Sequence, residues 1–181
     1  MRNAIVIFLL VAASERARAG ELDLGVGVGA TTTQWSGDRG GGPTIDASWW
    51  FTDWLAATYA GKEQYASVDE RMLSYFSVGM SARRGPVVGS LGLVHQHEEP
   101  WPSVEDMPVG SVFGAGDGIR HRFGGRAAVH WILPFRAHAH GDFFASIDLD
   151  GAYFADDHGP AWMASLGASI GFSYDFARGS R

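Results

Sequence analysis

The sequence predicts an all-β fold, an antiparallel up-and-down transmembrane β-barrel. The first observation is that every second side chain between residues 161 and 176 is apolar or aromatic, whereas the side chains between them are small or polar. A strand places such sets on opposite faces, and about 10 tilted residues span a bilayer. The second is composition: 25 glycines, 13% aromatic residues and a mean hydropathy of −0.04 fit apolarity spread over alternate positions. We therefore expect lipid outside the barrel and a small polar lumen inside it.

The N-terminus predicts a targeting segment. Arg2 gives a basic start, residues 4–13 are apolar, and residues 17–19 form an Ala-x-Ala cleavage pattern before Gly20. The expected division of the chain is a signal peptide (1–19), an outer-membrane β-barrel (20–176) and a short C-terminal tail (177–181).

Charge and cysteine content exclude several classes of protein. Cleavage removes three arginines and one glutamate, so the net charge changes from −6 to −8. An acidic chain argues against nucleic acid as a partner. The absence of cysteine excludes a disulfide scaffold and a thiolate metal site.

Turn residues divide the mature chain into strands that alternate as the last one does. The acidic segment 98–108 contains three prolines, so we expect a long outer loop there rather than a strand. Residues 34–42 are rich in turn-forming residues, so we expect a loop there as well. The third expected strand begins at residue 55 and ends before the polar loop at 67–71. The other expected strands are 21–32, 43–51, 72–83, 87–97, 126–135, 143–153 and 161–176.

The strand count depends on residues 109–122, which alternate weakly. A single-chain barrel needs an even number of strands, and a strand at 109–122 would aim Asp117 at lipid, so we favour eight. Ten strands result if 136–140 helps to build another one. In a third arrangement 122–126 is a periplasmic turn and 136–160 is a long outer hairpin.

The sequence resembles the small OmpA/OmpX- and opacity-type outer-membrane barrels over nearly the whole mature chain. The resemblance rests on the signal peptide, the alternating strands, the short turn between Trp49 and Trp54, and the last strand ending at Phe172 to Phe176. It implies a Gram-negative outer-membrane location, contact with membrane lipids and lipopolysaccharide, and insertion by the barrel-assembly machinery. That machinery reads a terminal aromatic residue in the family, whereas 177–181 follow Phe176 here.

The expected lumen is lined by charges of both signs. An eight-strand barrel is just wide enough to be filled by side chains, and isolated buried charges are costly. We therefore expect ion pairs that plug the lumen, with a conducting pore or a small-solute site as alternatives. The expected inward charged or titratable residues are Glu21, Asp23, Asp46, Lys62, Arg83, Arg120, Arg126, His130, Asp148, Asp150 and Asp175.

Histidines form the sharpest candidate site. His95 and His97 are two residues apart, so both face one side of a strand, and His121 could approach them from the next segment. Imidazoles so placed can hold a divalent metal such as Zn²⁺. His138 and His140 repeat the spacing. The alternative is that these amphipathic side chains simply suit the boundary between water and headgroups.

We expect a monomer with a structural, adhesion or partner-binding role through its extracellular loops, without catalysis and without a cofactor other than the candidate metal. One alternative is a lipid-modifying or metal-binding barrel; acyl-transfer chemistry needs a serine activated by histidine. A second alternative is a periplasmic lipocalin-like ligand carrier, which would place its large apolar side chains inside. The candidate catalytic residues are Ser90, Ser103, Ser111, His95 and Glu98, but they form no close His-x-Ser pair in the sequence.

Overall fold

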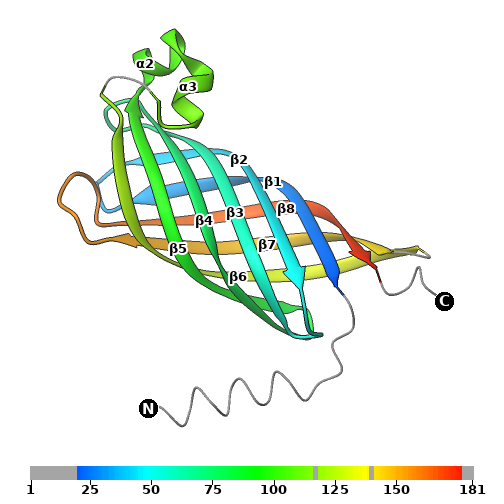
Figure 1. Ribbon diagram of the computed structural model, residues 1–181. Helices are drawn as coiled ribbons and strands as arrows, with labels where there is room; N and C mark the ends of the chain where they lie inside the picture. Colours follow the sequence, from blue (N-terminus) through cyan, green and yellow to red (C-terminus); the bar gives the residue numbers. More distant parts are fainter. Residues whose placement is uncertain (1–19, 116–117, 139–140, 177–181) are drawn as a thin grey trace, which may run out of the picture.

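The protein is a closed barrel of eight antiparallel strands, each paired with the next, with β8 closing on β1. The computed structural model describes residues 20–115, 118–138 and 141–176 (Figure 1). The signal peptide and the tail expected at 1–19 and 177–181 lie outside the described residues. The elements are β1 (Glu21–Thr33), β2 (Arg39–Trp50), β3 (Leu55–Ala66), β4 (Arg71–Arg84), β5 (Val87–Pro100), α2 (Trp101–Asp106), α3 (Pro108–Val112), β6 (Arg120–His138), β7 (Gly141–Phe154) and β8 (Trp162–Asp175).

The side-chain alternation of β8 shows which face of the strand forms the outer wall and which lines the lumen. Leu166 and Ile170 are 60% and 64% exposed on the outer wall, whereas Ser165 and Ser169 are each 5% exposed and face the lumen. Large apolar side chains outside and small polar ones inside are the arrangement of a membrane barrel. The lipocalin-like alternative is wrong, because it requires the opposite orientation.

Two glycines allow the paired strands β4 and β5 to approach each other closely. Gly79 pairs in register with Gly92, and a Cβ on Gly79 would lie 2.1 Å from the carbonyl oxygen of Leu91. A side chain at this position would therefore push the strands apart.

Several strands extend beyond their expected ends. β6 spans Arg120–His138 rather than 126–135, and β4 begins at Arg71, which was expected in the loop at 67–71. β2 begins at Arg39 rather than at residue 43, and β5 continues through Glu98 and Glu99 to Pro100. Proline is tolerated at the end of β5 because β6 pairs with β5 only as far as Glu98, so Pro100 has a free edge on that side. The rest of the segment expected to be an outer loop forms the short helices α2 and α3, which lie at the outer end of the barrel (Figure 1).

The uncertain region around β6 resolves in favour of eight strands. Residues 108–112 form α3, and β6 begins only at Arg120. Segment 122–126, considered as a periplasmic turn, lies inside β6 and pairs with β5, so the third arrangement is wrong. Among the described residues, no helix is long and apolar enough to cross a membrane.

Candidate functional site

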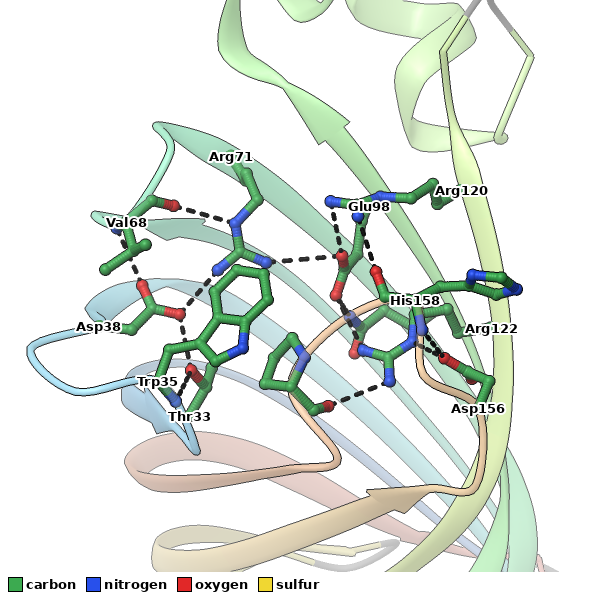
Figure 2. A network of polar contacts seen from close by, with 12 residues as sticks. Thr33, Trp35, Asp38, Val68, Arg71, Glu98, Arg120, Arg122, Asp156 and His158 are labelled. Atoms are coloured by element: carbon green, nitrogen blue, oxygen red, sulfur yellow. Dashed lines mark hydrogen bonds and ion pairs between the residues drawn. The ribbon is translucent and has the colours of Figure 1, made fainter.

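The outer end of the lumen is closed around one buried carboxylate, that of Glu98 on β5. Its side chain is completely buried and faces three guanidinium groups (Figure 2). The distances from Glu98 oxygens are 3.1 Å to Arg122 Nη1, 3.3 Å to Arg120 Nη2 and 3.5 Å to Arg71 Nη1. A buried charge is tolerated when it is paired in this way. The three arginines therefore compensate the charge of Glu98 and hold its side chain in place.

Arg71 connects Glu98 to the first outer loop. Its Nη2 lies 2.7 Å from Asp38 Oδ2, and its guanidinium stacks over Trp35 at 4.4 Å. Asp38 also accepts a hydrogen bond from the Thr33 hydroxyl at 2.7 Å (Figure 2). The loop between β1 and β2 is thereby fastened to the start of β4.

Arg122 connects Glu98 to the last outer loop. Its Nε donates to Asp156 Oδ1 at 2.8 Å and its Nη2 donates to the carbonyl of Pro160 at 3.0 Å. Burial alone raises the pKa of Asp156, but the hydrogen bonds from Arg122 and from the backbone N–H of His158 outweigh it and lower that pKa. The segment between β7 and β8 is thus held to the same network.

A second layer of charges fills the middle of the lumen. Asp150 pairs with Lys62 at 2.8 Å and with Arg126, while Asp148 lies 2.7 Å from His130 Nδ1. These residues come from three strands, β3, β6 and β7, and so tie opposite walls together.

A third layer lies near the chain termini. Arg83 pairs with Glu21 at 2.6 Å and stacks over Trp50 at 4.1 Å. The indole N–H of Trp50 donates to Asp23 at 2.6 Å. The lumen thus contains the expected ion pairs at each of these three levels.

The space left in the lumen is small. Two cavities along the inner wall measure about 30 Å³ each, which is room for roughly one or two water molecules. A larger cavity of about 450 Å³ lies at the terminal end, where Glu21, Arg83 and Pro86 contribute to its lining. The middle of the lumen therefore has room for only a few water molecules, whereas its terminal end is more open.

The three histidines singled out from the sequence come together on the outer wall. His95 and His97 lie on the outward face of β5, and His121 on β6 pairs in register with His97. His95 Nε2 lies 3.2 Å from His121 Nδ1, and one ligand nitrogen from each ring falls within 4.8 Å of the others. The three imidazoles that the sequence singles out are thus neighbours in the structure.

The outer-loop segment covers part of this histidine cluster. His97 is only 5% exposed, and a Cβ built on Gly114 would lie 2.5 Å from its ring. Gly114 adopts a φ of 68°, a left-handed conformation that suits glycine. Glu99, two residues beyond His97 and so on the same face of β5, is buried as well.

The other sequence candidates are placed elsewhere. His140 and the side chain of His138 lie outside the described parts of the chain. Ser90 faces the lumen, where it is hydrogen-bonded to Ser81 at 2.7 Å, so it is separated by the barrel wall from His95. The Ser111 hydroxyl donates to the carbonyl of Met107 at 3.0 Å. The Ser90–His95 combination does not form a catalytic pair.

Apart from Arg120, which was expected to face inward, the members of the outer network were missed because they fell in segments expected to be loops or turns. Arg71 has the same strand parity as the inward Tyr75, and Arg122 the same parity as the inward Arg126. Extending the alternation past the expected strand ends would have placed both in the lumen. Asp38 lies in a turn, where no periodicity applies.

Comparison with known proteins identifies the fold. No protein-family model and no curated protein sequence matches the chain. Among solved structures, neisserial surface protein A is 17% identical with a TM-score of 0.54, covering 90% of this chain and 100% of that one. Ail, the attachment invasion locus protein of Yersinia pestis, solved with the heparin analogue sucrose octasulfate, is 16% identical with a TM-score of 0.46, covering 86% and 97%. The outer membrane protein OprG from Pseudomonas aeruginosa is 9% identical with a TM-score of 0.47, covering 87% and 96%. The match to neisserial surface protein A, together with the closed eight-strand topology, shows the fold of the small outer-membrane β-barrels, as the resemblance in the sequence implied.

Proposed function

We propose that this protein is a non-conducting outer-membrane barrel that presents a rigid outer surface to lipids or to a binding partner. The observation that carries the proposal is the network around Glu98, which closes the lumen and fastens the β1–β2 and β7–β8 loops to one buried centre. A general solute pore needs a continuous aqueous path, whereas filled small barrels have none. The fixed outer loops are the surface that such a barrel offers for contact.

The proposal includes the route to the membrane and the surroundings there. We expect the signal peptide at 1–19 to be cleaved before Gly20, which the mass of the mature protein would report. The exposed apolar wall would contact outer-membrane lipids and lipopolysaccharide, and the barrel-assembly machinery would insert the chain as a monomer. The structural basis is the outward band that includes Leu166 and Ile170.

Conductance across planar lipid bilayers tests the proposal. The refolded wild-type barrel should give no steady conductance, because ion pairs occupy the lumen at three levels. A large porin inserted under the same conditions provides the positive control. Stable, ohmic channels from every inserted wild-type barrel would contradict the proposal and favour a pore.

One observation favours divalent-metal binding as a second function. The imidazoles of His95, His97 and His121 converge on one spot of the outer wall, whereas amphipathic histidines at a membrane boundary need not converge.

A further inference from the structure

We propose that His95, His97 and His121 form a zinc site on the outside of the barrel, where it joins β5 to β6 beneath the segment that contains α3. The site lies on the opposite side of the wall from the lumen network. Zinc binding at this site would therefore not depend on whether the lumen conducts.

The nitrogen positions fit a tetrahedral ion. Two ligands of a tetrahedral zinc with Zn–N bonds of about 2.0–2.1 Å lie roughly 3.3 Å apart. The His95 Nε2 to His121 Nδ1 distance is 3.2 Å, and the third nitrogen falls within 4.8 Å of the others. A small rotation of one imidazole would complete the three-histidine set and leave a fourth position open.

The buried member of the cluster points to a ligand. The exposed fraction of His97 is 5%. Its Nδ1 is buried without a hydrogen-bond partner at standard distance, and the backbone of Val112 on α3 also interacts with this side chain. Buried polar groups are nearly always satisfied. A bound cation would satisfy the imidazole of His97.

The surroundings favour a cation and hold the rings in place. Glu99 lies on the same face of β5, and its Oε1 is buried without a hydrogen-bond partner in the structure. His95 stacks on Phe123 at 4.3 Å with planes 15° apart. His97 packs edge-on against Phe76 at 5.7 Å. These contacts limit the orientations open to the His95 and His97 rings before an ion arrives, which lowers the cost of binding.

The contact between Gly114 and His97 links the ion to the outer segment. Because the backbone at Gly114 packs directly on the His97 ring, fixing the ring should also fix the residues that follow α3. Zinc should therefore slow backbone amide exchange in residues 107–115, and this effect gives a readout independent of affinity.

Zinc titration of the refolded, tag-free barrel in detergent tests the site, with isothermal calorimetry for stoichiometry and Co²⁺ absorption for tetrahedral geometry. One ion per chain at micromolar concentration or tighter is expected. His121→Asn should weaken binding at least tenfold; this residue is exposed, so folding should survive. His95→Asn supplies a second variant, and amide exchange without metal shows whether each variant is folded.

Two controls separate this site from other histidines. His158→Asn removes an exposed imidazole from an outer loop and should leave zinc affinity unchanged. The double variant His138→Asn, His140→Asn should also bind normally. Absence of zinc binding by wild type, or binding that is kept in His121→Asn and lost in the His138/His140 double variant, would overturn the proposal.

Discussion

At the residue scale, Glu98 is the residue that joins the charged side chains at the outer end of the lumen. Its carboxylate is fully buried and shared among Arg71, Arg120 and Arg122. Removing one partner from a buried ion cluster leaves the remaining charges uncompensated, which costs more than the pairing itself contributes.

Glu98→Ala should therefore lower the free energy of unfolding by roughly 3–5 kcal/mol. Urea unfolding in detergent micelles, followed by tryptophan fluorescence, measures the change. Glu105→Ala is the matched control, because this exposed glutamate makes one hydrogen bond, to Trp101; its effect should stay below about 1 kcal/mol. Equal effects of the two substitutions would show that the cluster does not hold the outer end together.

Asp156 gives the outer network a defined pH dependence. Burial opposes ionisation, but the hydrogen bonds from Arg122 and the His158 backbone lower its pKa in the folded protein. A carboxyl with a lowered folded pKa stabilises the fold above its unfolded pKa, and this contribution is lost as pH falls through the folded value.

The stability difference between wild type and Asp156→Asn should therefore be constant near neutral pH and shrink only below about pH 4. Unfolding midpoints measured across the pH range test this expectation, with the asparagine variant as the chain that cannot titrate at this position. A difference that already disappears between about pH 7 and pH 5 would mean that Asp156 is not the group involved.

The sequence identified the histidine cluster but, apart from Arg120, not the arginines that surround Glu98. His95 and His97 share a face because strand residues two apart always do, and His121 was near enough in the chain to reach them. Arg71 pairs with Asp38 across 33 residues, and no local pattern reports that contact. Long-range pairing between a strand end and a turn therefore required the structure.

At the element scale, alternation predicts the strands and fails at their ends. β8 was predicted well because eight apolar or aromatic side chains follow one register from Trp162 to Phe176. β5 was expected to end at His97, yet it continues to Pro100, because neighbouring β4 supplies pairing partners up to that residue. The helices α2 and α3 are too short for a helical period to stand out.

The environment of the outer wall can be tested by placing the same charge at two positions of similar exposure. Ile170 is 64% exposed on β8 and Val109 is 72% exposed on α3. Ile170→Arg should cost about 2–4 kcal/mol in lipid, as a charge does near the bilayer midplane. Val109→Arg should change stability by less than about 0.5 kcal/mol.

Unfolding in phospholipid vesicles measures both variants. If the two substitutions have the same effect, the band around Ile170 does not face hydrocarbon, and the outer wall would need another covering.

At the scale of the whole molecule, the two faces of one wall carry different chemistry. Inside, ion pairs lie at three levels of the lumen and leave two cavities of about 30 Å³ each, with a larger cavity of about 450 Å³ at the terminal end. Outside, apolar side chains surround the barrel, and the histidine cluster lies at its outer end beside α3. Glycine content and alternation predicted this difference between the two faces, because alternate side chains of a strand point to opposite faces and the apolar residues of this chain follow one alternation.

Lipid accessibility along the outer wall tests the central claim most directly. The chain has no cysteine, so single cysteines at Leu166, Ile170 and Val109 can each carry a nitroxide label in reconstituted membranes. Electron paramagnetic resonance should show oxygen reaching the labels at 166 and 170 while a water-soluble nickel reagent is excluded, with the reverse at 109. Equal access of the nickel reagent to all three labels would contradict the assignment of this barrel to a membrane.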